Sequence, residues 1–311
     1  MKICMVGLGS IGARHLRNLP DVLSTRKTEF QIDAFRSNNR ELPEDVKRLL
    51  IKQYFHEAEL PNDYDVAFIC TPTSEHFKTI RMMIPRAKHL FIEKPVFVNC
   101  SEGSSLSLQT GQIYYVACPM RYSKLLITLR NMLHEKKVFS ARIISSTYLP
   151  AWRPNTDYRK IYSASAKMGG GIELDMIHEW DYVCWLFGFP QEVSVYIGKV
   201  SDLEIDSNDI AVYIGKYQDK LVSVYLDYFG NPWKREIELH TSDGTIVTDL
   251  IQQQIRMLKN GTVLDCTEDR DAMQKRELSC FFDMIDGKCE NTNSVETAIK
   301  MLSIAKGEYR P

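Results

Sequence analysis

The chain has 311 residues, of which 44% are hydrophobic and 25% charged, a composition typical of a globular protein with room for two ordinary domains. Its 39 basic and 40 acidic residues nearly cancel, so nucleic acid is not a favoured partner. No apolar run is long enough to span a membrane, and the first strand pattern begins at Lys2 and leaves no room for a targeting segment, so we expect a cytoplasmic protein.

A G-x-G-x-x-G turn at residues 7–12 follows an apolar strand pattern at residues 2–6. Helical character at residues 13–19 completes the strand-turn-helix context in which this pattern binds a dinucleotide. The tight turn, the close approach of the backbone to a pyrophosphate and the packing of helix on strand each require a glycine. The expected cofactor contacts here are Gly7, Gly9, Ser10, Ile11 and Gly12. The alternative is a glycine-rich turn without a ligand.

Strand and helix patterns alternate through the first third of the chain. This β-α-β alternation predicts a doubly wound parallel sheet in an α/β domain. The expected strands are residues 30–35, 65–70, 89–92 and 113–117, and the expected helices include residues 44–52 and 75–84.

Long strand patterns with short turns replace this alternation from residue 139 onward. They predict an α+β domain around a large, mostly antiparallel open sheet. The sheet would have one face on helices and the other either solvated or paired with a second subunit, and we favour a homo-oligomer. The expected strands are residues 139–148, 192–200, 209–217, 220–229, 233–241 and 245–250. We therefore divide the chain into a dinucleotide-binding domain, 1–118, and a substrate-binding and oligomerisation domain, 119–311.

Polar segments follow two of the expected parallel strands, at residues 70–76 and 91–95. Ligands of open α/β sheets bind outside the carboxyl ends of the strands, so these segments should border the cofactor. A lysine at such an edge, partly desolvated, could have a pKa low enough for proton transfer, whereas an isolated Lys94 would more often be a surface lysine. The expected cofactor contacts from these segments are Thr71, Pro72, His76, Glu93 and Lys94.

A run of three glycines at residues 169–171 leads into an expected helix that carries Asp175, His178 and Asp181 at intervals of three. This spacing places the three side chains on roughly one helix face, where the histidine could donate or accept a proton near neutral pH. Asp181 could instead serve only to stabilise the helix. No metal site is expected, because there is no second ligand cluster and the eight cysteines form no C-x-x-C pair.

The residues after the second strand bear on the choice of cofactor. An NAD-binding domain usually has an acidic residue there, which accepts hydrogen bonds from the ribose 2′-hydroxyl. This chain has Arg36 and Ser37, and Asp33 lies too early, within the strand. Because a guanidinium can pair with a 2′-phosphate, NADP(H) is favoured over NAD(H).

The ordered set of motifs resembles the glucose-fructose oxidoreductase and inositol dehydrogenase family (Gfo/Idh/MocA) over nearly the whole chain. The resemblance implies a Rossmann domain followed by a C-terminal domain with an open sheet used for oligomer contacts. It also implies that Lys94 and His178 carry the proton traffic, that Glu93 helps to set the lysine, and that Asp175 orients the substrate or the imidazole. The matching segments are residues 7–12, 71–76, 93–95, 120–122, 169–178, 235–244, 277–287 and 294–305.

The chain departs from the family pattern at one point. Many relatives have three residues between the aspartate and the histidine, whereas Asp175 and His178 have two between them. One residue rotates a helical side chain by about 100°, so Glu173 is a possible stand-in for Asp175.

Aromatic and arginine side chains are concentrated at residues 152–162, just ahead of the catalytic helix. Rings stack on sugar faces and arginines grip carboxylate or phosphate groups, so an anionic sugar derivative would suit them. A structural loop, its arginines paired with Asp157 and Glu173, is the alternative. The candidate substrate contacts are Arg121, Trp152, Arg153, Tyr158, Arg159 and Tyr162.

The function that we expect is hydride transfer between a nicotinamide cofactor and a carbinol or keto carbon of a sugar, sugar nucleotide, sugar acid or cyclitol. One alternative is an enzyme that recycles its cofactor during net non-redox, glycosidase-like sugar chemistry. Another is a cofactor-binding sensor or co-regulator, against which the presence of both Lys94 and His178 argues.

Overall fold

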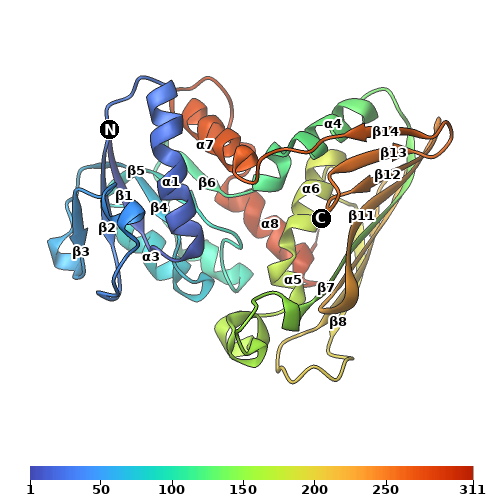
Figure 1. Cartoon of the computed structure of the whole chain (residues 1–311), viewed down its shortest axis with the longest axis horizontal. Helices are drawn as coiled ribbons and strands as arrows, with labels where there is room; N and C mark the ends of the chain where they lie inside the picture. Colours follow the sequence, from blue (N-terminus) through green and yellow to red (C-terminus); the bar gives the residue numbers. More distant parts are fainter. Residues whose placement is uncertain (311) are drawn as a thin grey trace. The chain divides into compact units, whose positions relative to one another are not determined.

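The computed structural model describes residues 1–310, apart from the side chain of Ser104. The chain forms two compact units (Figure 1). The first comprises Met1–Pro119 and Asp271–Ile299, and the second comprises Met120–Arg270 and the residues from Lys300 onward. Each unit thus combines two separate segments of the chain, whereas the division expected from the sequence is contiguous.

The first unit contains a six-stranded parallel sheet of order β3-β2-β1-β4-β5-β6. The order reverses between β1 and β4, which is the switch point of a doubly wound sheet. This arrangement confirms the predicted α/β fold. The strands are β1 (Lys2–Val6), β2 (Gln31–Phe35), β3 (Lys52–Tyr54), β4 (Tyr64–Ile69), β5 (Ala87–Ile92) and β6 (Tyr114–Val116), and the helices are α1 (Ser10–Thr25), α2 (Glu44–Lys47), α3 (His76–Met83) and α7 (Ala272–Ile285).

The helix expected at residues 44–52 is wrong in its second half. Only Glu44–Lys47 is helical, and Lys52–Tyr54 forms β3 at the edge of the sheet. The amide of Ile51 already donates to the carbonyl of Ile32 on β2, at 2.8 Å. Pairing with a neighbouring strand therefore decides the conformation of these residues, and a short amphipathic pattern does not reveal it.

Residues far along the chain complete the first unit. Arg26, which ends α1, donates to Asp283 of α7 at 2.8 Å. Asn293 donates from Nδ2 to the carbonyl of Val116 at 2.6 Å and accepts from the amide of Val116 at 2.9 Å. The segment around Asn293 thus satisfies the outer edge of β6, which would otherwise be an open strand edge.

The second unit contains an eight-stranded sheet of order β14-β13-β12-β11-β7-β10-β9-β8. All neighbouring pairs are antiparallel except β7 and β10, so the predicted mostly antiparallel open sheet is confirmed. The two short strands β13 and β14 were not predicted. The strands are β7 (Val138–Tyr148), β8 (Glu192–Gly198), β9 (Ile210–Lys216), β10 (Leu221–Asp227), β11 (Phe229–Thr241), β12 (Gly244–Asp249), β13 (Gln254–Met257) and β14 (Thr262–Asp265).

One face of this sheet carries a hydrophobic core with α4 (Lys124–Leu133), α5 (Ile172–Asp175) and α6 (Ile177–Phe187). Trp180 of α6 packs edge-on against Tyr213 of β9, with ring centroids 5.5 Å apart. On β10, Val222 and Val224 are fully buried while Ser223 between them is partly exposed. This alternation, which the sequence predicts, identifies the covered and the open face. A further helix, α8 (Val295–Ala305), carries the chain from the first unit to the second.

No helix within residues 1–310 is both long and apolar enough to cross a membrane.

Candidate functional site

Two glycines of the 7–12 turn cannot carry a side chain. Gly7 has φ of +91°, and a Cβ there would lie 2.8 Å from the carbonyl oxygen of Cys70. A Cβ on Gly12 would lie 2.2 Å from the carbonyl oxygen of Gly7. The turn therefore brings the start of α1 against the ends of β1 and β4, as the sequence predicts for a dinucleotide site.

Gly9 differs from these two glycines, because a Cβ there would meet no atom within 4 Å. It is the N-cap of α1, where no side chain accepts a hydrogen bond, and the first turn of the helix has no acidic residue. Ser10 is exposed and Ile11 partly exposed. Open space beside backbone amides at the positive end of a helix fits a pyrophosphate, so these residues fit a dinucleotide cofactor.

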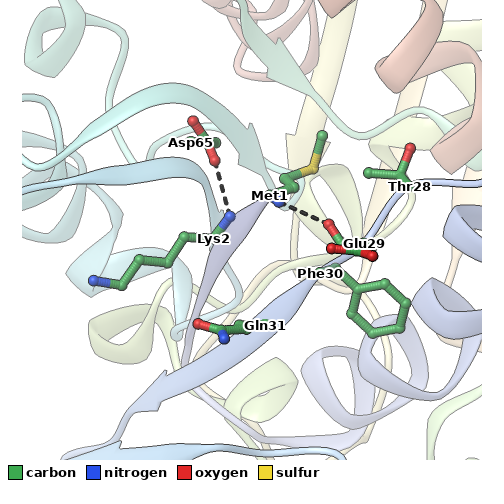
Figure 2. A pocket seen from close by; sticks show the side chains of 7 residues that line it. All are labelled: Met1, Lys2, Thr28, Glu29, Phe30, Gln31 and Asp65. Carbon is green, nitrogen blue, oxygen red and sulfur yellow. Dashed lines mark hydrogen bonds between the residues drawn. The ribbon is translucent and has the colours of Figure 1, made fainter.

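A separate hollow at the opposite end of this sheet is drawn in Figure 2. It lies where β1, β2 and β4 begin, and the backbone amide of Lys2 donates there to Asp65 at 2.9 Å. Ligands of doubly wound sheets bind at the carboxyl ends of the strands, so we do not assign this hollow to the cofactor. Its lining residues are Met1, Lys2, Thr28, Glu29, Phe30, Gln31 and Asp65.

The loop after β4 places Thr71 partly exposed and Pro72 exposed at the carboxyl edge, but His76 is 1% exposed. The Nδ1 atom of His76 lies 3.1 Å from the carbonyl oxygen of Val96, and its Nε2 atom lies 3.0 Å from that of Thr71. Burial lowers the pKa of His76, although both carbonyl contacts oppose this shift. His76 therefore joins the loops that follow β4 and β5, and its imidazole lies inside the fold.

Glu93 and Lys94 follow β5 at the same edge, and both are partly exposed. Glu93 contacts His15 of α1, with 2.6 Å between Oε1 and Nε2, and its Oε2 accepts from the amide of Lys94 at 3.2 Å. Burial favours the neutral carboxyl, but His15 and Lys94 outweigh it and lower the pKa of Glu93. The carboxylate thus fixes the backbone from which Lys94 projects.

His15 is a residue that our sequence reasoning missed. It is 1% exposed, and its ring packs edge-on against Phe91 with centroids 5.0 Å apart. The sequence did carry a signal for His15, which is a polar residue three positions after Gly12 and on the inward face of an amphipathic helix. Its partner Glu93 lies 78 positions away, so the sequence did not reveal the pair.

Arg36 lies just after β2 as expected, but its guanidinium already has protein partners. Its Nη1 donates to Gln53 at 2.7 Å, its Nη2 donates to the carbonyl of Arg40, and its Cζ lies 5.8 Å from the centroid of the Phe55 ring. Burial lowers the pKa of Arg36 from its usual value, and the residue is 9% exposed. Ser37, the next residue, is exposed.

Asp33 cannot replace the missing ribose acid in this arrangement. It is buried within β2 and accepts a hydrogen bond from the hydroxyl of Tyr64 at 3.0 Å. The edge beyond β2 therefore offers Arg36 and Ser37, without the carboxylate that usually binds a 2′-hydroxyl.

The glycine-run segment is not the single helix predicted from the sequence. It forms α5 and α6, separated at Met176, where φ is −99° and ψ is 28°. The regular rotation of about 100° per residue therefore does not continue from Asp175 to His178. The expectation that Asp175 shares one helix face with His178 and Asp181 is wrong, because Asp175 ends α5 whereas the other two lie on α6.

Asp175 lies at the centre of a cluster of phenol groups. Its Oδ1 accepts from the hydroxyl of Tyr162 at 2.5 Å, and its Oδ2 accepts from the hydroxyl of Tyr228. The ring of Trp152 packs edge-on against that of Tyr228, with centroids 5.4 Å apart. Tyr228 is buried, whereas Tyr162 is 40% exposed. This cluster presents Tyr162 and Trp152 beside a carboxylate. His178, two residues into α6, is partly exposed.

Asp181 and Arg121 form a buried ion pair. Nε and Nη2 of Arg121 donate to the two carboxylate oxygens of Asp181 at 2.9 and 2.7 Å, and the side chains are 6% and 8% exposed. Burial raises the pKa of Asp181, although Arg121 opposes the shift. The pair favours a structural role for Asp181 and places Arg121, a candidate substrate contact, inside the second unit.

Glu173, the possible stand-in for Asp175, is also buried. Its Oε1 accepts from Nδ2 of Asn208 at 2.8 Å, and its Oε2 has no hydrogen-bond partner among the described residues. Burial raises the pKa of this carboxyl group.

Of the remaining candidate substrate contacts, Tyr158 and Arg159 have protein partners, whereas Arg153 is exposed. Arg159 donates to Asp157 at 2.9 Å and to Glu204 at 3.1 Å, and the hydroxyl of Tyr158 accepts from the amide of Glu204 at 3.2 Å. The structural-loop alternative thus holds for Arg159 with Asp157, but Glu173 pairs with Asn208 instead.

Two family models match the chain. Residues 1–110 match the oxidoreductase family with an NAD-binding Rossmann fold, and residues 126–247 match the GFO/IDH/MocA C-terminal domain. A myo-inositol 2-dehydrogenase of Thermotoga maritima is 24% identical over 275 residues, which cover 81% of this chain and 76% of that protein. A scyllo-inositol 2-dehydrogenase (NADP⁺) of Bacillus subtilis is 24% identical over 204 residues, covering 63% of this chain and 54% of that protein.

Solved structures of the same architecture support the fold. A levoglucosan dehydrogenase in complex with NADH and levoglucosan has a TM-score of 0.80 at 15% identity, covering 98% of this chain and 95% of that one. A myo-inositol 2-dehydrogenase from Lactobacillus plantarum has a TM-score of 0.76 at 18% identity, covering 99% and 96%. With the family models, these similarities confirm the predicted resemblance. The chain belongs to the Gfo/Idh/MocA family of oxidoreductases and carries its NAD-binding Rossmann fold.

Proposed function

We propose that this oxidoreductase transfers a hydride between C4 of a nicotinamide cofactor and a carbinol or keto carbon of a sugar, sugar nucleotide, sugar acid or cyclitol. The observation that carries the proposal is the Glu93–Lys94 segment, which follows β5 at the same sheet edge as the open glycine turn after β1. An amine held there by a fixed backbone can serve proton transfer beside a bound dinucleotide. The inositol and levoglucosan dehydrogenases named above support the substrate class.

The bound cofactor would supply the redox chemistry, while the protein supplies position and proton transfer. Gly9, Ser10 and Ile11 would hold the pyrophosphate, and Thr71 and Pro72 would border the cofactor at the end of β4. Lys94 would move the hydroxyl proton of the substrate, and Glu93, kept ionised by His15, would hold the lysine backbone in place. His178 would be the second proton-transfer group.

In the second unit we propose that Asp175 orients the substrate. With both oxygens accepting from phenols, Asp175 is an acceptor, so it would position hydroxyl groups, directly or through Tyr162. Trp152 and Tyr162 offer aromatic surface for a sugar face, and exposed Arg153 offers a cation for an anionic group. We leave out Arg121, which is buried in its ion pair with Asp181, and Tyr158 and Arg159, which both contact Glu204.

For the cofactor we propose a preference for NADP(H) over NAD(H). Beyond β2 a 2′-phosphate would meet the exposed Ser37 and the Arg36 guanidinium, whose contact with the Arg40 carbonyl it could replace, and the usual carboxylate is missing. Fluorescence titration with NADPH and NADH compares the two affinities directly.

We also propose a homo-oligomer that pairs the open faces of the second-unit sheets. Tyr196, Val212, Tyr225 and Ile144 lie in register across four neighbouring strands, and Tyr196 is 55% exposed. A continuous apolar row on an open face favours a partner over solvent. Tyr196→Glu should lower the mass measured by light scattering without lowering the melting temperature of the monomer. An unchanged mass would indicate a solvated face.

Lys94→Met and His178→Asn test the proposed mechanism. Removing a proton-transfer group typically costs 10²–10⁴-fold in rate, so we expect kcat to fall by about that factor while cofactor affinity changes little. The readout is the steady absorbance change of the nicotinamide in a screen of inositols, sugar acids and sugar nucleotides.

Lys88→Met is the matched control, because Lys88 lies on β5, the strand that Lys94 follows, and pairs with Asp65 at the exposed surface. Full turnover in Lys94→Met would rule out the mechanism. Substrate conversion without a steady absorbance change would indicate the cofactor-recycling alternative.

A further inference from the structure

Two cysteines lie together at the end of α7. The Sγ atoms of Cys280 and Cys289 are 3.8 Å apart, which is contact distance for two sulfur atoms. Cys289 is exposed and Cys280 is partly exposed. Of the other six cysteines, Cys100 is partly exposed and the rest are buried: Cys4, Cys70, Cys118, Cys184 and Cys266.

The end of α7 explains why these two sulfurs meet. Gly287 has φ of +70°, its amide donates to the carbonyl of Met284 at 3.1 Å, and the amide of Lys288 donates to the carbonyl of Asp283 at 2.8 Å. These two bonds form a Schellman turn, which reverses the chain at a helix end. The reversal brings Cys289 back beside Cys280, one turn before Asp283. The proximity therefore follows from the backbone of the turn.

We propose that Cys280 and Cys289 form a reversible intrachain disulfide, which makes the end of α7 a thiol modification site. Bond formation brings the two sulfurs, which are 3.8 Å apart here, to about 2.05 Å. The oxidant would be a low-molecular-weight disulfide, which accepts the two electrons.

The reaction has two balanced steps. The thiolate of one of the two cysteines attacks one sulfur of the small disulfide, which forms a mixed disulfide and releases one small thiolate. The thiolate of the other cysteine then attacks the protein sulfur of the mixed disulfide, which forms the intrachain bond and releases the second small thiolate. The two protons from the cysteines end on the released thiols.

Burial and the neighbouring Cys280 sulfur raise the pKa of Cys289 to about 11. Because only a thiolate attacks a disulfide, the exchange should run faster as the pH rises.

The bond would close a loop around the ion pairs that attach α7 to α1. Arg26, at the end of α1, pairs with Asp283 at 2.8 Å and also with Asp286. Both aspartates lie between the two cysteines in the sequence. A cross-link from residue 280 to residue 289 would therefore restrict the unfolded chain and hold the helix end that carries these pairs.

Peptide mapping tests the proposal on the full-length protein, because trypsin cleaves after Lys288 and separates the two cysteines. After incubation with oxidised glutathione, a non-reducing digest should contain peptide 277–288 linked to peptide 289–300. Dithiothreitol should release them, and Cys280→Ser and Cys289→Ser should each abolish the linked species. Cys100→Ser is the matched control and should retain it. Glutathione adducts on both cysteines without the linked peptide, or a link found only between chains on a non-reducing gel, would overturn the proposal.

Thermal unfolding gives an independent readout. The oxidised wild-type protein should melt about 5 °C higher than the reduced protein, as expected for closing a short loop in a unit of this size. Cys289→Ser should show no difference between the two conditions. An equal shift in Cys289→Ser would mean that the small disulfide acts elsewhere, and it would overturn the role of this pair.

Discussion

The two glycine-rich segments, residues 7–12 and 169–171, both precede a helix, yet the two helical regions differ. In the first, α1 begins within the segment at Ser10 and continues unbroken to Thr25. After the second, α5 stops at Asp175 and α6 restarts at Ile177. The first segment acts through its backbone, whose conformation is determined by residues next to it in the sequence. The second supplies side chains whose partners lie elsewhere in the sequence, such as Tyr228, 53 positions from Asp175. Local pattern is therefore a good guide to the first segment and a poor one to the second.

Gly12→Ala and Gly9→Ala form the most severe test of this contrast. The added methyl group at Gly12 would lie 2.2 Å from the Gly7 carbonyl, so we expect a loss of more than about 4 kcal/mol in the free energy of unfolding, or no folded protein. At Gly9 the methyl group would meet no protein atom, so stability should change by less than about 0.5 kcal/mol.

Cofactor affinity should instead fall at least tenfold in Gly9→Ala, because the methyl group occupies the space proposed for the pyrophosphate. Urea unfolding and a fluorescence titration with NADPH measure the two effects. Unchanged affinity in Gly9→Ala would remove the turn from the cofactor site.

Asp181→Asn and Asp175→Asn test the second segment. The first change removes the carboxylate charge from the buried ion pair with Arg121, and breaking such a pair typically costs about 3–5 kcal/mol of stability. The second keeps an oxygen that can still accept from one tyrosine, so we expect a loss of about 1 kcal/mol.

The activities should follow the opposite order. Asp175→Asn should lower kcat/KM at least tenfold, whereas residual folded Asp181→Asn should retain near-normal kcat/KM. Equal activity losses in both variants would mean that the two carboxylates do not have separate roles.

The sequence was most informative where one element determines its own conformation. The Rossmann strands, the glycine turn and the open sheet all follow from local periodicity and turn chemistry. It was uninformative where contacts with another part of the chain decide the conformation. Examples are β3, which pairs with β2, and Arg36, which donates hydrogen bonds to Gln53 and Arg40. His15 and Glu93 are the clearest case, because neither position indicates the other.

Arg36→Ala tests whether the buried guanidinium contacts the cofactor. If Arg36 contacts a 2′-phosphate, the ratio of NADPH to NADH affinity should fall about tenfold, as for the loss of one charge-assisted hydrogen bond. Gln53→Ala is the matched control, because it removes one protein partner of Arg36 and keeps the guanidinium. If the ratio of NADPH to NADH affinity is unchanged in Arg36→Ala, Arg36 only stabilises its own loop.

The smallest expected effect is the pH dependence contributed by Glu173. Burial raises the pKa of this carboxyl group in the folded protein above its usual value, so the folded state binds the proton more tightly than the unfolded state. Its contribution to stability is therefore fully present below the unfolded pKa and is lost as pH rises through the folded pKa.

Glu173→Gln removes this titration and keeps an oxygen that can accept from Asn208. We expect it to be more stable than the wild type by roughly 1 kcal/mol at pH 8, with the difference vanishing near pH 4. Urea unfolding of both proteins across this range measures it. A Glu173→Gln protein that is less stable than the wild type at pH 8 would have the wrong sign for a buried neutral acid, and would mean that Glu173 is ionised and paired.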